Sequence, residues 1–140
     1  MKILFASDGS ACSERAAQYL IASLRKQLRS IEVTLFYVCA PMLDRVAAAL
    51  GEDRVAEIHR EDSGEALKTV RQRLKRARLA FDEAHTAGNA AYCIAQKAAK
   101  GKYDLVLMGS HGRSALKNAL LGSVTARVLA ECKVPVLVVH

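Results

Sequence analysis

Apolar runs with the length of a β-strand recur along the chain and alternate with stretches of helical periodicity. Four runs are almost continuously apolar, at residues 2–6, 31–39, 103–108 and 134–139. Strands without polar alternation are typical of a parallel sheet buried on both faces. Because the 140 residues also fit one domain, the sequence predicts a single α/β domain over residues 1–140, with a parallel, doubly covered sheet.

The stretches between the strands have helical patterns of unequal clarity. The firmest helices are expected at about residues 12–29, 90–100 and 123–131, and Gly101 is expected to end the second as its C′ residue. Residues 42–78 are irregular, with a loop or short helix up to residue 49 and at least one helix within residues 53–78, punctuated at 62–64. Residues 79–85 form a weak strand candidate, and its acidic residues favour a sheet edge.

A glycine-containing stretch follows the strand expected at residues 103–108. Gly109, Gly112 and Gly122 are spaced along it, and Ser123 opens the next helix directly behind Gly122. Glycine permits positive φ and close approach of a ligand to the backbone. A helix N-terminus adds free N–H groups and the positive end of the helix dipole, so this stretch predicts an anion cradle.

The donors of this cradle can be assigned by residue type. Backbone N–H groups, two hydroxyls and two mobile cations would serve a phosphate, and they come from Gly112, Ser123, Val124, Thr125, Arg113 and Lys117.

A second polar turn, at residues 7–10, follows the first strand. Ligands of parallel sheets bind outside the carboxyl ends of the strands, so the two turns face one crevice if their strands are neighbours. Asp8 would then accept from a ribose hydroxyl or bind through a metal. The alternatives are a plain turn and helix cap for residues 8–10 and an exposed loop histidine for His111.

Several common catalytic and phosphate-binding motifs are absent from the sequence. There is no G-x-x-x-x-G-K-[ST], no G-x-G-x-x-G and no G-x-S-x-G, and Gly101-Lys102 precedes Tyr103 rather than a hydroxyl residue. The acidic pairs at residues 61–62 and 82–83 are adjacent, so their side chains point apart. No catalytic residue and no metal ligand is therefore predicted.

The net charge of +7 suits an anionic ligand. Much of the excess lies on one helical segment, where apolar residues interleave with Arg71, Arg73, Lys75, Arg76 and Arg78. A solvated basic face is one interpretation and a nucleic-acid surface the other. Because no aromatic residue and no known nucleic-acid motif accompanies the cations, nucleic acid is the less favoured partner.

The cysteines and the apolar segments bear on the compartment. The four cysteines are Cys12, Cys39, Cys93 and Cys132. They are widely spaced and form no Cys-x-x-Cys motif, which argues against a zinc site and against disulfides. We expect them to be small buried hydrophobic residues. The apolar runs are too short to cross a bilayer, and the N-terminal residues do not have the pattern of a secretory signal. We therefore expect a cytoplasmic protein without membrane contact.

The chain resembles the nucleotide-binding subclass of the universal stress protein family. The resemblance rests on the opening strand and Asp-Gly-Ser turn at residues 3–10, the G-x2-G-x9-G-[ST] signature within 104–125, and the Pro-Val-Leu-Val-Val strand within 134–139. It covers nearly the full length and is weakest at residues 42–85. The family often has proline or valine before the aspartate, where this chain has Ala6-Ser7, and backbone contacts there do not depend on the side chain.

The resemblance implies a Rossmann-like, five-stranded parallel sheet in the order 3-2-1-4-5 with helices on both faces, similar to the adenine nucleotide alpha hydrolases. It also implies binding of ATP, with Mg²⁺ as an optional companion, and a dimer. By position, Asp8 would contact the ribose, and the backbone near Val38 and Cys39 would meet adenine. The complete set of expected nucleotide contacts is Ala6, Ser7, Asp8, Val38, Cys39, Met108, Gly109, His111, Gly112, Arg113, Gly122, Ser123, Val124 and Thr125.

These observations favour a nucleotide-dependent binding module of the stress response. The alternatives are a slow ATPase or autophosphorylating protein, with Ser110, Ser114 and Ser123 as the nearest hydroxyls, and a basic binding surface on residues 71–78. The closing strand, Val136–Val139, is too apolar to be left as an exposed edge. Pairing with a second copy would cover it, as would a segment of its own chain.

Overall fold

Five parallel strands form one sheet at the centre of the computed structural model, which describes residues 1–113 and 120–140. The strands are β1 (Lys2–Ala6), β2 (Glu32–Cys39), β3 (Asp82–Ala87), β4 (Leu105–Gly109) and β5 (Val136–Val139). Their order across the sheet is β3-β2-β1-β4-β5, which confirms the expected order 3-2-1-4-5. At the end of the central strand, Ala6 pairs with Phe36 of β2 and with Met108 of β4, so the carboxyl-terminal parts of three strands lie side by side.

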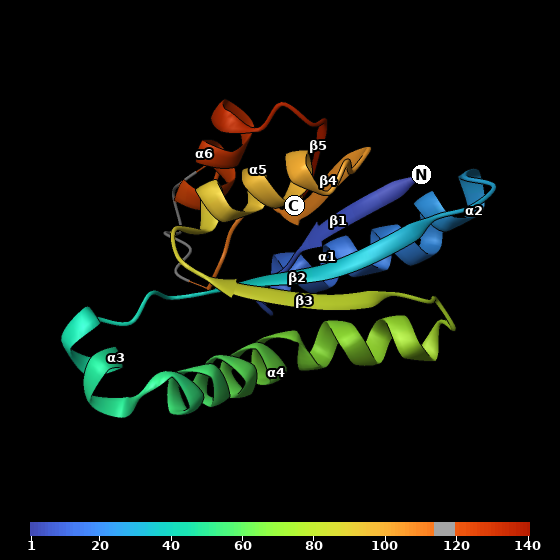
Figure 1. Cartoon of the computed structure of the whole chain (residues 1–140). Coiled ribbons are helices and arrows are strands. Elements are labelled where there is room, and N and C mark those ends of the chain that lie inside the picture. Colours follow the sequence, from blue (N-terminus) through green and yellow to red (C-terminus); the bar gives the residue numbers. More distant parts are fainter. Residues whose placement is uncertain (114–119) are drawn as a thin grey trace.

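Helices cover both faces of the sheet, as expected (Figure 1). They are α1 (Ala11–Tyr19), which runs through a π-helical turn (η1, Leu20–Leu24) into α2 (Arg25–Gln27), then α3 (Asp44–Leu50), α4 (Glu52–Arg76), α5 (Ala90–Lys100) and α6 (Ser123–Glu131). Helices α1 and α4 pack with Phe5 and Leu107 on one face, and α5 and α6 pack with Leu4 and Val106 on the other. Within the described part of the chain, no helix is both long and apolar enough to span a bilayer.

Helix α4 is a single helix of 25 residues, although the cluster at residues 62–64 was expected to punctuate it. Its buried positions are Ser63, Ala66, Leu67, Val70 and Leu74, which recur every three or four residues. The Ser63 hydroxyl donates to the carbonyl of Arg60, 3.1 Å away. Packing of this stripe against the sheet therefore outweighs the weak helix propensity of the cluster.

Strand β3 lies at the sheet edge, as predicted, but begins at Asp82 rather than at residue 79. Leu79 is still part of the turn that ends α4, because its N–H donates to the carbonyl of Leu74 at 3.1 Å. Arg78 has a φ of 54° in this turn. Leu79 is buried in the core below α4, so its apolar character reflects the end of the helix and not the start of the strand.

Three other expected boundaries shift by one or two residues. The predicted strand at 103–108 is β4 at Leu105–Gly109, and the closing strand begins at Val136 rather than at residue 134. Gly101 is not the left-handed residue that ends α5, because its φ is −79° and Lys102 has the positive φ of 52°. A Cβ on Gly101 would collide with the ring of Tyr103, so packing explains this glycine.

The basic segment of α4 is partly used within the fold. The guanidinium of Arg71 binds the carboxylate of Glu83 on β3, with an Nε–Oε1 distance of 2.6 Å. Arg73 reaches Glu14 on α1, with an Nη2–Oε2 distance of 2.7 Å. Two of the five cations that were expected on a solvated face therefore hold α4 to its neighbours.

The four cysteines are free, as expected. Cys12 and Cys39 are buried, which confirms the prediction for these two, whereas Cys93 and Cys132 are half-buried.

Candidate functional site

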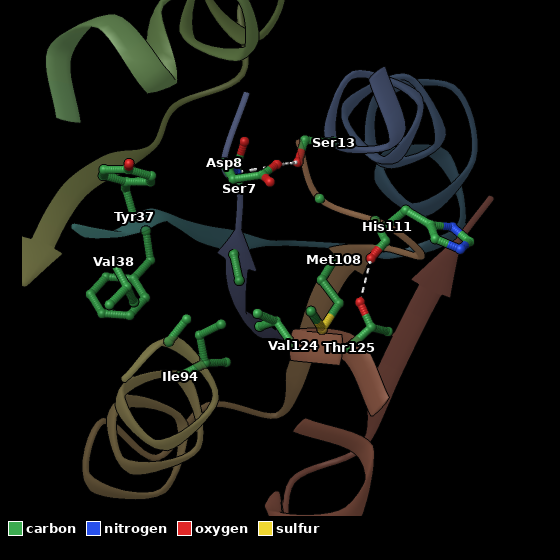
Figure 2. A pocket seen from close by; sticks show the side chains of 15 residues that line it. Ser7, Asp8, Ser13, Tyr37, Val38, Ile94, Met108, His111, Val124 and Thr125 are labelled. Atoms are coloured by element: carbon green, nitrogen blue, oxygen red, sulfur yellow. Dashed lines mark hydrogen bonds between the residues drawn. The ribbon is translucent and has the colours of Figure 1, made fainter. Parts of the chain in front are cut away.

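A cavity lies at the carboxyl ends of β1, β2 and β4 (Figure 2). An inner, mostly apolar part and an outer part with a larger polar share in its lining have residues from these strands in common, so the two are continuous. The outer part has a volume of about 670 Å³, which lies within the range of small-molecule sites. All fourteen residues that the sequence suggested as nucleotide contacts line one part or both.

The inner part is a slot between the sheet and two helices. Figure 2 shows Val38 and Ile94 on one side and Met108 and Val124 on the other. These side chains are apolar, and Ala6 at the end of β1 also lines the slot. An apolar slot between aliphatic side chains suits a planar ring that loses water on binding.

Asp8 joins the loop after β1 to the loop after β4. Its Oδ1 accepts from the N–H of Ser10 at 3.0 Å and from the hydroxyl of Ser13 at 2.9 Å. Its Oδ2 accepts from the N–H of Arg113 at 3.0 Å. The side chain of Arg113 makes a second contact with Asp8, because its Nε donates to the carbonyl of Asp8 at 2.6 Å. The carboxylate is therefore a link between the two loops that form the cavity mouth.

The environment of Asp8 favours its charged form. Burial raises the pKa of this carboxyl, but hydrogen bonds from Ser10, Ser13 and Arg113 act in the opposite direction and outweigh it. The pKa of Asp8 is consequently held below its ordinary value of 3.8. Among the described residues, Oδ2 accepts from the N–H of Arg113, so it retains acceptor capacity toward the cavity.

The glycines of the signature fit neighbouring parts of the chain. A Cβ on Gly109 would lie 2.6 Å from the Cβ of Cys12 on α1, and one on Gly112 would lie 2.7 Å from Oδ2 of Asp8. A Cβ on Gly122 would lie 3.2 Å from the Cα of His111. The positive φ values that the sequence suggested for this stretch occur elsewhere, at Gly9, Gly51 and Gly88. Close packing is therefore what these three positions require.

Helix α6 begins at the outer part of the cavity without a side-chain cap. Its N-cap is Gly122, whose own N–H donates to the carbonyl of Ser110 at 2.8 Å. The N–H groups of Ser123, Val124 and Thr125 belong to the first turn, where no intrahelical acceptor exists. Helix α1 differs, because the hydroxyl of its N-cap residue already accepts from an N–H of its first turn. The start of α6 is the better anion-binding position of the two.

Two of the residues expected to line the ribose or phosphates have other contacts. The hydroxyl of Thr125 donates to the carbonyl of Gly109 at 3.0 Å, so it fastens α6 to the end of β4 (Figure 2). The ring of His111 points away from the slot, and its Nδ1 lies 3.0 Å from the hydroxyl of Ser110. The carbonyl of His111 accepts from the hydroxyl of Ser10 at 3.1 Å. His111 therefore lines the cavity chiefly through its main chain, and Ser110 is buried beneath it.

Tyr37 and Cys39, at the end of β2, face the long helix α4. The hydroxyl of Tyr37 donates to Oδ2 of Asp62 at 3.1 Å, and the guanidinium of Arg113 lies 5.8 Å from the tyrosine ring centre. Burial, with the charge of Asp62, raises the pKa of Tyr37 to about 12 and that of Cys39 to about 11. Both groups are therefore neutral at physiological pH, and the thiol is not an activated nucleophile.

Several lining residues were not expected from the sequence. Tyr37, Ala90 and Ile94 belong to this group, together with Ser13, Phe36, Ala40, Gly88 and Leu121. The rule that ligands bind at the carboxyl ends of parallel strands also applies to β3, and it could have indicated residues 88–90. Nothing comparable marks Ile94, because its orientation depends on how α5 packs. Ser114 and Lys117, which were expected near the phosphates, lie outside the described residues.

Replacing Asp8 by asparagine tests the link between the two loops. We expect Asp8→Asn to lower the free energy of unfolding by about 1–2 kcal/mol at pH 7, because the charged acceptor of three hydrogen bonds is lost. The folded-state pKa is depressed, so this contribution is present above the ordinary value of 3.8 and is lost as the pH falls through the lower folded value. Urea unfolding between pH 7 and pH 2 measures the difference.

Asp82→Asn, at an exposed position on β3, is the matched control and should change stability little at any of these pH values. A difference between wild type and Asp8→Asn that stays constant down to the lowest pH would contradict the role of the charge.

Known proteins resemble this chain over its full length. The family model described as the universal stress protein family matches residues 1–140. Universal stress protein MJ0531 of Methanocaldococcus jannaschii is 31% identical over 138 residues, which are 99% of this chain and 81% of that protein.

Solved structures extend the likeness to the fold. The structure of the hypothetical protein MJ0577, from the same organism, aligns with a TM-score of 0.79 at 29% identity and covers 99% of this chain and 94% of that one. A universal stress protein in complex with cAMP aligns with a TM-score of 0.70 at 23% identity and covers 100% and 97% of the two chains. Sequence and structure agree that the chain belongs to the universal stress protein family.

Proposed function

We propose that this protein binds an adenine nucleotide, with ATP as the specific ligand, in the cavity at the strand ends. One observation carries the proposal: an apolar slot opens directly onto a helix N-terminus that has no side-chain cap. A purine base is apolar on its faces and a phosphate is anionic, so the two parts of the cavity match the two ends of a nucleotide.

Each part of the nucleotide has a candidate contact. The base would lie between Val38 and Met108, and the phosphates would accept from the N–H groups of Ser123 and Val124. The remaining acceptor capacity of Asp8 faces the space between them and suits a ribose hydroxyl. Magnesium would arrive on the phosphates of ATP, because a metal of this kind keeps most of its water and needs few protein ligands.

Proteins of this fold give independent support for the ligand class. Universal stress protein structures have been solved with cAMP, with AMP and with dAMP. These three ligands share adenine and a phosphate group. We extend the class to this chain because its own slot and helix N-terminus offer a place for both groups.

The geometry favours holding the nucleotide over cleaving it. Asp8 accepts hydrogen bonds from three protein donors. Ser110 is buried, and the hydroxyl of Thr125 donates to a carbonyl. We therefore propose a cytoplasmic regulatory module whose conformation or partner choice depends on nucleotide occupancy. The ion pairs of Arg71 and Arg73 make a nucleic-acid surface on α4 the weaker alternative.

Filling the slot tests the binding proposal. We expect Val124→Trp to lower the affinity for ATP by about ten-fold or more, because the indole would occupy space that the base needs. Leu129→Trp is the matched control: it lies on the same helix, is similarly exposed, and does not line the cavity. Isothermal titration calorimetry with ATP, ADP and AMP measures the affinities. Wild-type protein that binds none of the three at about 1 mM would overturn the proposal.

Hydrolysis is tested separately with the same variants. We expect phosphate release from ATP in the presence of the wild-type protein to stay near the rate in buffer, because Asp8, the carboxylate among the described lining residues, has a lowered pKa and is therefore a weak base toward water. Release that is clearly faster than buffer and is lost in Val124→Trp would show that the protein is an ATPase, while leaving nucleotide binding intact.

We further propose a homodimer in which two β5 strands meet. All four residues of β5 are half-buried, and the strand ends the sheet. The carbonyl of Pro135 accepts from an N–H of β4, and the carbonyl of Val139 accepts from the N–H of the residue that follows β4. Alternate residues of a strand face opposite neighbours, so the N–H of Val138 points to the outer edge of the sheet. That N–H would be available to a second copy.

Val138→Pro removes this outward donor and leaves the hydrogen bonds to β4 in place. We expect the variant to be monomeric in light scattering at a concentration where the wild type is dimeric, whereas Val138→Ala should remain a dimer. A wild-type protein that stays monomeric at high concentration would remove the proposal.

A further inference from the structure

A second hollow lies on the α5 side of the sheet, apart from the cavity at the strand ends. It runs between α5 and the edge strand β3, and its volume is about 640 Å³. Helix α5 packs its apolar stripe of Ala91, Ile94 and Ala98 toward the middle of the sheet. The edge strand is consequently left partly uncovered on this side, with Thr86 half-buried, and a groove remains beside the helix.

The charged residues of this groove are all lysines. Lys2, Lys97 and Lys100 line it together with His85, and among the described residues no aspartate or glutamate does so. None of the salt bridges found between described residues includes these lysines. Asp104 lies near one end but accepts from the main-chain N–H of Lys2 at 2.6 Å. The groove thus gathers three ammonium groups with no carboxylate in its lining.

Two of the ammonium groups are held close to aromatic rings of the groove. Nζ of Lys2 lies 4.7 Å from the ring centre of Tyr103 and donates to the carbonyl of Gly101 at 2.9 Å. Nζ of Lys97 lies 5.8 Å from the ring centre of Phe36. The hydroxyl of Tyr103 is fixed in turn by the hydroxyl of Thr34, 2.8 Å away. These contacts place the two charges beside the aromatic rings of the groove.

We propose that this groove is a second binding site, for a small organic anion that combines an aromatic ring with a phosphate or carboxylate group. The like charges of the lysines repel one another, and an anion between them would relieve that repulsion. The exposed ring of Tyr92 at the rim offers apolar surface to the body of the ligand, above a floor to which the largely buried rings of Phe36 and Tyr103 contribute. The volume exceeds what a lone phosphate needs and suits a small organic molecule.

Phenyl phosphate is a suitable probe, and amide chemical shifts in NMR spectra report where it binds. We expect the amides of Gln96, Lys97 and Gly101 to shift with a dissociation constant of about 1 mM or lower. Benzyl alcohol, which lacks the charge, and inorganic phosphate, which lacks the ring, should each bind these amides about ten-fold more weakly. Shifts confined to the amides at the start of α6, or no shifts at all, would overturn the proposal.

Lysine variants separate a site from a general effect of net charge. The double variant Lys97→Gln with Lys100→Gln should weaken phenyl phosphate binding by about ten-fold, and Lys100→Gln alone by about three-fold. The control, Lys68→Gln with Lys75→Gln on α4, removes the same charge at exposed positions outside the groove and should change nothing. Equal weakening by both pairs would show diffuse attraction and overturn the proposal. Thermal unfolding of each variant checks that the fold is retained.

Discussion

The carboxylate of Asp8 is the contact on which the candidate site depends most. It accepts hydrogen bonds from Ser10 and Ser13, at the start of α1, and from Arg113, in the loop after β4. The neighbouring positions of β1 and β4 in the sheet make this contact possible. Because one charged group satisfies donors from both loops, the cavity mouth is formed by the protein before any ligand arrives, and less ordering is left for binding.

The glycines of the signature support the same arrangement by allowing segments of the chain to pack closely. Gly109 lets α1 approach the end of β4, and Gly112 leaves room for the carboxylate of Asp8. Gly122 allows the chain that enters α6 to pass close to His111. The free N–H groups of α6 reach the cavity because of these close approaches. The glycine spacing therefore relates to the proposed nucleotide binding indirectly, through the packing of the protein on itself.

Local patterns in the sequence predicted the elements whose cause is local. The apolar runs indicated four of the strands, and helix α5 was expected at its observed limits, residues 90–100. The course of α4 and the start of β3 were missed, because there the cause is tertiary. Ser63 is carried inside a helix by the packing of its neighbours, and Leu79 is buried while the chain is still leaving the helix.

The candidate site likewise combines features with a local cause and features with a tertiary cause. Part of its lining was predicted from strand ends and glycine spacing and part from the family resemblance, but neither indicated the hydrogen-bond partners of individual groups. Thr125 was expected to donate to a phosphate and instead donates to Gly109, because the rotation of α6 turns its hydroxyl toward β4. Tyr37 and Ile94 join the lining through the packing of side chains from separate elements, which no spacing in one segment encodes. A sequence specifies such contacts only through the complete fold.

The excess positive charge has no single location in the fold. Arg71 and Arg73 are neutralised by carboxylates of β3 and α1, whereas Lys2 and Lys97 rest against aromatic rings on the opposite face. A cation that is paired inside the fold contributes little to the field that an incoming ligand meets, while an unpaired one keeps its full effect. The net charge of +7 therefore acts on anions through the cations that lack a carboxylate partner, and among the described residues three such lysines line the α5 groove.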